Sequence, residues 1–453
     1  MVTLFGVLLT VGGLAVAGWL LATRGKVVAA FGDARTALAL VGFAVGLSAA
    51  PVLAGKRSSA LIGLLVAGLL AWVLWSGRHD LRSRGGVNLR SRNSLGLRGP
   101  DDRWLRVAWA AAAVLLVWCV AVDALTGAGL YGSRLVAYAA AGLLLLAGAL
   151  LAGRAALTTR ATAYLGLAVL AVLTIPTALT GSAAWRPCTA GKLEKCSAAG
   201  ALFKSFFDSE NYIALITSFT LVAAVCALRR AELAATTVFC LLIIVATGSR
   251  TSYLALAAAG AWLLGSFLLE RRRRYARIHL AGCAALVLAS VGVATYLMWT
   301  ASRTTLSNRG NIWVVAREYL ADATATGVGV SKWYRLQDAG DAPTHFFHSG
   351  YVLVVFAGGF VALAVWALWA TALLHGRVDD GRAFTAKAPV ALLLVYSLTE
   401  VVWNPLSVDG LSWIFLALML TRSWVTPAHR PPATGPVDAA AVTGRGRWAG
   451  RRR

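Results

Sequence analysis

The sequence predicts an all-α, polytopic membrane protein, and three observations support this: long apolar runs, few charged residues and basic clusters on alternate loops. Hydrophobic residues make up 58% and charged residues 14% of the 453 residues, whereas a soluble domain carries about 25% charged residues. Several apolar runs exceed the roughly 18 residues that indicate a spanning helix. We therefore expect about 12–13 transmembrane helices and one large extracytoplasmic loop containing short helices.

The candidate spans lie near the ~20 residues needed to cross the hydrocarbon. They are 2–22, 36–53, 59–76, 104–125, 135–152, 161–180, 211–228, 233–249, 251–269, 279–299, 350–374, 388–402 and 409–421. We expect a single integral-membrane domain over residues 1–425, with the large loop at 300–349. The tail 426–453 is rich in Pro, Ala, Gly and Arg, a composition typical of disorder.

The formal charge of +24 would suggest a nucleic-acid partner in a soluble protein. Here the cations gather in loop 77–103, at Arg229 and Arg230, in the run 271–274 and in the tail. Cations in alternate loops indicate cytoplasmic segments, so no nucleic acid is expected. We predict a protein of the cytoplasmic (inner) membrane with a cytoplasmic carboxyl terminus. Loop 181–210, the break near Arg250 and loop 300–349 then face outside.

Loop 300–349 carries most of the candidate chemistry. Arg309 begins a predicted amphipathic helix, and Ser307 and Asn308 are reasonable caps for it. A helix start beside an arginine favours phosphate, because free backbone donors meet a fixed guanidinium. The alternative is a solvated loop with an ordinary cap. We expect further substrate contacts from four other basic residues of the loop: Arg317, Lys332, Arg335 and His345.

His348 is the candidate proton acceptor. Histidine suits proton transfer near neutral pH, and the small residues Ser349 and Gly350 leave room for a substrate. A metal pair with His345 is the alternative, but no HExxH pattern and no third ligand accompany it. We therefore expect no metal and no cofactor.

Two further candidates border apolar runs. Arg250 stands between two spans among small hydroxyl residues, so it is either an interfacial anchor or a functional cation. Asn211 enters a span from the predicted outer side and either caps that helix or contacts substrate. Glu210 beside it is one of few acids on that side.

Cys188 and Cys196 share the outer loop 181–210, eight positions apart. A disulfide could persist there if the compartment is oxidising. A zinc site is not expected, because no other ligands have suitable spacing.

These features, in this order, resemble the O-antigen ligase and polymerase family of bacterial membrane glycosyltransferases over roughly residues 200–375. The pieces that carry the resemblance are Asn211, Ser249-Arg250, Arg309 with Ile312-Trp313, Gly327-Val328-Gly329 and His348-Ser349-Gly350-Tyr351. Ser349 stands where the family often has asparagine, and Thr326 stands where it often has proline.

The resemblance implies a cell-envelope enzyme that transfers a glycan from an undecaprenyl-diphosphate carrier to a hydroxyl acceptor on the outer face, without a metal ion. It assigns His348, Arg250 and Arg309 to catalysis, and it adds Tyr351 to the substrate contacts. The partners are then the lipid-linked glycan donor, a glycan, lipid or protein acceptor, and membrane lipid.

Four alternatives stay open. A flippase or other transporter of lipid-linked oligosaccharide would concentrate ionisable residues inside its spans. A metal-dependent glycosyltransferase would need outer carboxylates to hold its cation, and the first outer loop near Lys56 has none. A cell-wall glycan polymerase would need an acid such as Glu210 or Asp208. A polysaccharide polymerase of the same family differs from a ligase only in its acceptor.

Overall fold

The computed structural model describes residues 1–31, 39–44, 64–65, 67–69, 71, 100–126, 129–151, 157–188, 195–207, 209–269, 275–375, 387–409 and 411–423. Most of the predicted spans 36–53 and 59–76 lies outside these residues. So do most of the basic loop 77–103, Asp208, the run 271–274 and the tail 426–453.

The described part of the chain is mostly helical, which confirms the predicted fold class. Among the described residues, seven helices are long and apolar enough to cross a membrane: α1 (Val2–Ala22), α5 (Pro100–Leu125), α9 (Glu210–Ala227), α10 (Arg230–Thr247), α11 (Arg250–Leu269), α12 (Tyr275–Thr300) and α15 (Gly350–His375). Two shorter apolar helices are α6 (Leu135–Leu151) and α7 (Thr159–Thr174). α6 coincides with the candidate span 135–152, whereas α7 ends at Thr174, before the end of the candidate span 161–180.

The remaining elements are short. The helices among them are α2 (Arg24–Phe31), η3 (Gly132–Arg134), α8 (Thr177–Thr180), η4 (Gly181–Ala184), α13 (Thr305–Leu320), α14 (Val330–Ala339), α16 (Ala388–Tyr396) and α17 (Ser412–Leu420). Two small sheets pair β1 (Leu157–Thr158) with β4 (Thr421–Ser423) in parallel, and β2 (Trp185–Pro187) with β3 (Ala201–Phe203) in antiparallel.

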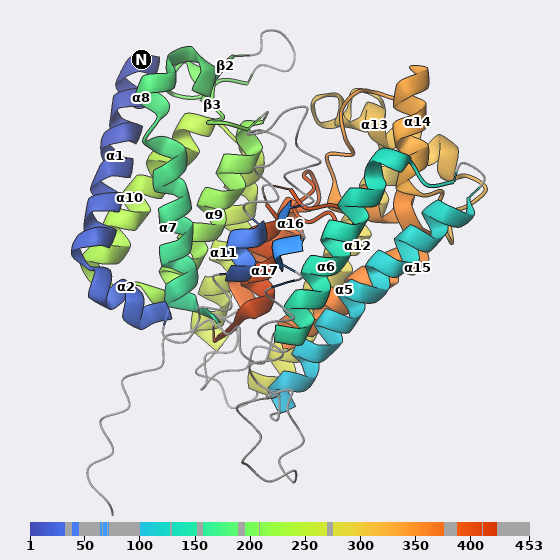
Figure 1. Cartoon of the computed structure of the whole chain (residues 1–453), viewed down its shortest axis with the longest axis horizontal. Coiled ribbons are helices and arrows are strands. Elements are labelled where there is room, and N and C mark those ends of the chain that lie inside the picture. The colour runs from blue at the N-terminus through green and yellow to red at the C-terminus, as the bar shows by residue number, and fades with distance from the viewer. Residues whose placement is uncertain are drawn as a thin grey trace, which may run out of the picture.

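The helices form two groups with the C-terminal hairpin α16–α17 between them (Figure 1). One group holds α1, α7, α9, α10 and α11, and the other holds α5, α6, α12 and α15. The β2–β3 hairpin and the short helices α13 and α14 gather at the same end of the bundle (Figure 1). The polar segments that the sequence predicts on one side of the membrane thus lie at the same end of the fold.

Helix α15 is broken at Gly358 and Gly359, where the backbone leaves the helical conformation. The loop before α14 supplies partners at this break, since the Val328 amide donates to the Phe356 carbonyl at 2.9 Å. On the other side, the Trp118 indole N–H donates to the Gly358 carbonyl at 2.7 Å. A broken helix inside a bundle is tolerated when neighbouring groups satisfy its freed backbone in this way.

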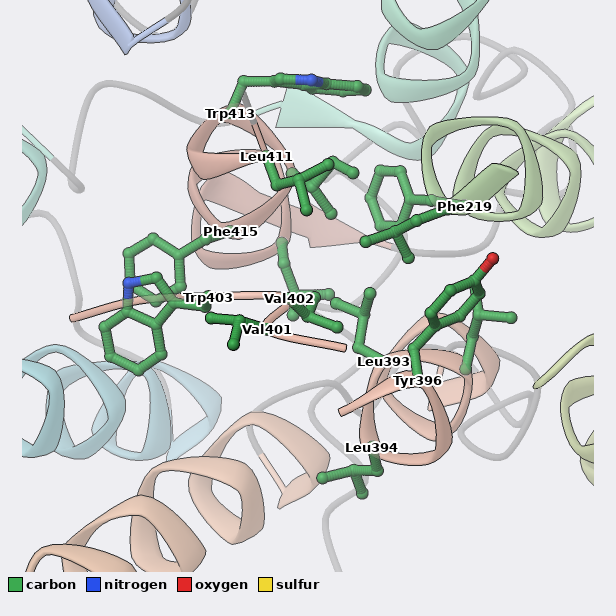
Figure 2. Close-up of a cluster of buried hydrophobic side chains, with 14 of the residues drawn as sticks. Phe219, Leu393, Leu394, Tyr396, Val401, Val402, Trp403, Leu411, Trp413 and Phe415 are labelled. Carbon is green, nitrogen blue, oxygen red and sulfur yellow. The ribbon is translucent and has the colours of Figure 1, made fainter. Parts of the chain in front are cut away.

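The hairpin α16–α17 is held by an aromatic core. Trp403 and Phe415 stack with ring centroids 4.1 Å apart, and Trp413 meets Phe219 of α9 edge to face at 5.9 Å (Figure 2). Aromatic pairs of this geometry contribute roughly 0.5–1.5 kcal/mol beyond their burial. The core fixes the turn that joins the two helices against α9.

Two helix boundaries differ from the expectation. The helix predicted over 388–402 ends at Tyr396, because the carbonyls of Ser397 and Glu400 accept hydrogen bonds from the Gly350 amide, at 2.9 and 3.1 Å. The helix predicted to begin at Arg309 begins at Thr305, after a turn in which the Thr305 amide donates to the Ser302 carbonyl. Arg309 therefore lies in the second turn, away from the free amides of the helix start.

Substitution of Gly327 by alanine should lower the melting temperature of the detergent-solubilised protein. The Gly327 φ is +79°, and an added Cβ would lie 2.5 Å from the backbone nitrogen of Gly359. Such a φ costs an ordinary residue about 1–2 kcal/mol, and the backbone clash adds to this. Gly340→Ala is the matched control, because its φ is +82° but a Cβ there meets nothing within 4 Å. Equal shifts for the two variants would contradict the close packing at the α15 break.

Candidate active site

A buried carboxylate, Glu400, lies at the centre of the polar cluster. Its Oε1 accepts a hydrogen bond from Asn211 Nδ2 at 2.6 Å and forms an ion pair with the Arg309 guanidinium. Its Oε2 lies 3.6 Å from His348 Nδ1. Four side chains from distant parts of the sequence, Asn211, Arg309, His348 and Glu400, thus converge on one point. We call these four residues the Glu400 cluster.

His348 reaches Glu400 because the start of α15 docks on the turn after α16. The Gly350 amide binds two carbonyls of that turn, as described above, and the Ser349 hydroxyl donates to the Ser397 carbonyl at 3.2 Å. His348 itself has a φ of +47°. Few non-glycine residues adopt this left-handed conformation, and those that do cluster at functional sites.

Arg309, a residue of α13, extends its guanidinium to the same turn after α16. Besides its ion pair with Glu400, the guanidinium donates to the Thr399 carbonyl. One turn further along α13, the Trp313 indole N–H donates to the Phe347 carbonyl at 3.0 Å. This bond fixes α13 against the segment that carries His348, so the guanidinium and the imidazole are positioned together.

Asn211 does not cap its helix. Ser209 takes that role, with its hydroxyl accepting from the Asn211 amide at 3.3 Å. The Asn211 side chain therefore faces the site, where its Oδ1 accepts from the Ser249 hydroxyl at 2.8 Å and from Lys195 Nζ at 3.3 Å. The asparagine connects Glu400 to the start of α11.

Arg250 is an exposed first residue of α11. Its neighbours on both sides are anchored to the site, since Ser249 binds Asn211 and the Thr251 hydroxyl lies 2.9 Å from the Thr399 hydroxyl. The Thr399 carbonyl also accepts a hydrogen bond from Arg309. Arg309 and the residue after Arg250 therefore contact the same threonine. The backbone of Arg250 thus lies next to the Glu400 cluster.

Glu210 is 1% exposed and pairs with Arg186 at 3.0 Å and with Lys195. The Glu210 carboxylate is therefore engaged in ion pairs with two residues that precede α9 in the sequence. Cys188 and Cys196 are disulfide-bonded in the structure, with Cα atoms 4.7 Å apart. Lys195 is next to Cys196 in the sequence, and its side chain contacts Asn211.

The other sequence-predicted residues lie apart from the Glu400 cluster or have other contacts. Arg317 donates to the carbonyls of Met298 and Trp299 at the end of α12. Lys332 lies over the Tyr319 ring at 5.4 Å, and Arg335 lies over the Tyr131 ring at 6.0 Å.

His345 and Tyr351 flank His348 in sequence but differ in exposure. His345 is exposed, with its ring 5.9 Å from the His348 ring. Tyr351 is 2% exposed, and its hydroxyl donates to the Leu394 carbonyl at 3.2 Å. Only His345 of the pair is therefore open to a ligand beside His348.

The electrostatics of the cluster favour an ionised Glu400. Burial alone would raise the pKa of this carboxyl, but the Arg309 and His348 side chains outweigh it and hold the pKa below its usual range. Lys195 behaves differently, since burial lowers its pKa despite the nearby Glu210. The cluster therefore combines a fixed negative charge with cations that remain partly accessible, Arg309 having 17% of its side chain exposed.

Glu400 is the residue that sequence reasoning missed. It was assigned to the interior of the span 388–402 and was not considered among the outward acids. The sequence does contain a signal for Glu400. An ionisable residue within an apolar run is costly to bury, and it is therefore a candidate functional residue. The structure ends α16 before it, so Glu400 lies outside the seven long helices.

Residues 235–367 match the model of a protein family described as O-antigen ligase. The matched region contains Arg250, Arg309 and His348, whereas Asn211 and Glu400 lie outside it. No curated protein and no solved structure matches the chain.

The helical membrane fold and this match define a membrane glycosyltransferase of polysaccharide biosynthesis. Residues 235–367 of the chain form a domain of the O-antigen ligase family. This confirms the family predicted from the order of its motifs.

Replacing Glu400 with glutamine should lower the melting temperature at neutral pH, because Arg309 loses its buried counter-ion. A depressed carboxyl pKa contributes stability above the unfolded-state pKa, roughly 4.3, and this contribution is lost as the pH falls through the folded-state pKa. Thermal unfolding between pH 7 and pH 3 should therefore show the two proteins converging at the acid end.

The control for this experiment is Glu318→Gln. Glu318 is 57% exposed and lies 3.8 Å from Arg303 on the surface, and such pairs contribute about 0–1 kcal/mol. A gap between wild type and Glu400→Gln that stays constant across the pH range would contradict the depressed pKa of Glu400.

Proposed function

We propose that the protein transfers a glycan from undecaprenyl diphosphate to a hydroxyl acceptor on the outer face of the cytoplasmic membrane, with inversion and without a metal ion. The observation that carries this proposal is the convergence of His348, Arg309 and Glu400 at one end of the bundle. A proton acceptor and a fixed guanidinium side by side suit the displacement of a diphosphate by an alcohol.

In this reaction the acceptor oxygen attacks the anomeric carbon of the donor sugar. A new glycosidic bond forms as the bond from that carbon to the diphosphate oxygen breaks. The electron pair leaves with the diphosphate, whose growing negative charge Arg309 and Arg250 stabilise. Such cations accelerate the reaction because the charge is larger in the transition state than in the bound donor.

His348 takes the proton of the acceptor hydroxyl. Glu400 faces the Nδ1 side of the ring at 3.6 Å, which favours a proton on Nδ1 and leaves the Nε2 lone pair for the acceptor. This separation exceeds a hydrogen bond, and such contacts often shorten when substrate binds. Glu400 is thus a positioning residue for both His348 and Arg309.

The site is compatible with two acceptor classes. A ligase passes the glycan to a different lipid, protein or wall acceptor, whereas a polymerase passes it to another copy of the lipid-linked glycan. Both use the same donor and the same displacement, so the acceptor that supports turnover distinguishes them.

Glycan transfer from purified undecaprenyl-diphosphate donor, in the presence of a chelator, tests this function. His348→Ala should lower kcat by roughly 10²–10⁴-fold, the range for loss of a general base. Arg309→Ala and Arg250→Ala should each lower it by roughly 10²–10³-fold, as for loss of an oxyanion donor.

The control variant is Arg303→Ala, because the Arg303 side chain is 68% exposed and pairs with Glu318 at the surface. It should retain wild-type transfer. Full activity of the three site variants would exclude this site assignment, and loss of wild-type activity in chelator would favour a metal-dependent reaction. Binding and translocation of the donor without transfer would favour a transporter.

A further inference from the structure

A polar cavity of about 300 Å³ opens beside the Glu400 cluster. Its lining includes Tyr212, Tyr334, Gln337, Phe346, Asn404 and Asp409. This volume is at the lower end of the roughly 300–1,000 Å³ of ligand pockets. The cavity therefore has room for a small polar ligand.

The cavity adjoins the site through the chain itself. Tyr212 follows Asn211, Val401 follows Glu400, and both line the cavity. Phe346 is two residues before His348. Because consecutive Cα atoms are about 3.8 Å apart, the cavity lining is continuous in sequence with the Glu400 cluster at these three positions.

One wall of the cavity is aromatic and held rigid. The rings of Tyr334 and Phe346 are nearly parallel, at 18° and with centroids 6.0 Å apart. The Arg134 guanidinium lies 3.7 Å from the Tyr334 centroid, a cation–π contact that fixes this ring. These contacts cover the Tyr334 ring, and the Phe346 ring also lines the cavity. Aromatic rings suit the C–H face of a sugar, since their electron density attracts weakly positive hydrogens.

Polar groups of the lining remain available to a ligand. Asn404 is 7% exposed, and its Oδ1 accepts from the Leu406 amide at 3.0 Å. Within the described residues, neither Asn404 Nδ2 nor the Tyr334 hydroxyl has a hydrogen-bond partner. Both residues line the cavity, where an amide and a phenol can donate hydrogen bonds to the hydroxyl groups of a ligand.

The charge of the lining argues for a sugar and against a phosphate. Arg134 and Asp409 are its two charged residues, and their charges offset each other. A diphosphate would instead be attracted to Arg309 and Arg250. The two subsites thus differ in chemistry, with cations at the Glu400 cluster and an aromatic, amide-bearing surface in the cavity.

We propose that this cavity is a saccharide subsite that holds a sugar ring of the glycan substrate beside His348. The inference rests on the proposed glycan transfer. The ring can come from the donor glycan or from the acceptor, because both present hydroxyl groups and C–H faces. Phe346 supplies apolar ring surface, Tyr334 supplies a hydroxyl, and Asn404 supplies amide donors.

Two conservative variants test the subsite with little risk to folding. Tyr334→Phe removes the unpaired hydroxyl and keeps the ring contacts with Arg134 and Phe346. Asn404→Asp keeps the oxygen that binds the Leu406 amide and removes the amide donors. Tyr296→Phe is the matched control, since Tyr296 is 67% exposed on α12, outside the cavity lining.

Saccharide binding is measured first, by saturation-transfer NMR on the full-length protein in detergent. The probes are the glycan released from the host's own undecaprenyl-diphosphate pool and, separately, fragments of its finished surface polysaccharide. Wild type, Tyr296→Phe and His348→Ala should show saturation transfer to at least one probe. Tyr334→Phe and Asn404→Asp should each weaken that binding about fivefold, the value of one hydrogen bond.

Transfer kinetics then identify the source of the ring. A KM increase of about fivefold for the donor alone assigns the cavity to the donor glycan, and an increase for the acceptor alone assigns it to the acceptor. Unchanged saccharide binding and unchanged KM values in both variants would overturn the proposal. Saccharide binding that depends on the cavity in a protein without transferase activity would retain the subsite and reject the glycan transfer.

Discussion

The ion pair between Glu400 and Arg309 is the interaction on which the site depends. A carboxylate in a largely buried position is costly unless charges and hydrogen bonds compensate it. Arg309, Asn211 and His348 together provide that compensation. The same requirement brings α9, α13, α15 and the turn after α16 together, because each of them supplies or supports one partner.

The turn that carries Glu400 is fixed by the aromatic core of the C-terminal hairpin. Trp403 follows Glu400 by three residues and stacks on Phe415 of α17. After α17, strand β4 pairs with β1, which directly precedes α7. Interiors packed in this way change shape little. The carboxylate therefore presents a rigid reference point, against which the more exposed Arg250 and His345 can adapt to a substrate.

The roles of the cations and the carboxylate are complementary. In the proposed glycan transfer, a site made only of arginines would bind the departing diphosphate tightly and release it slowly. The Glu400 charge offsets part of that attraction before the donor binds and holds the Arg309 fork in one orientation. Preorganised groups of this kind cost little reorganisation during reaction.

Much of the fold could be predicted from the sequence. Apolar length alone indicated the long helices from α5 to α15, because hydrocarbon thickness fixes the length of a spanning helix. The family also followed from the motif order around Arg250, Arg309 and His348. The short helix α16 was predicted too long, since its end is set by hydrogen bonds to Gly350, a residue far away in the sequence.

The site was only partly predictable for the same reason. Arg309 and His348 could be recognised by residue type and position, but their meeting point could not. Glu400 resembled part of a span because the residues around it are apolar. Local patterns reveal which residues are polar, and only tertiary contacts reveal which of them form ion pairs.

A double-mutant cycle between Glu400 and Arg309 tests the central claim most directly. The single variants Glu400→Gln and Arg309→Met and the double variant are compared in melting temperature and in glycan transfer. Residues in contact couple by about 0.5–3 kcal/mol, so the double variant should be more stable than the sum of the two single losses predicts. Strictly additive losses in both measurements would contradict a site organised by this ion pair.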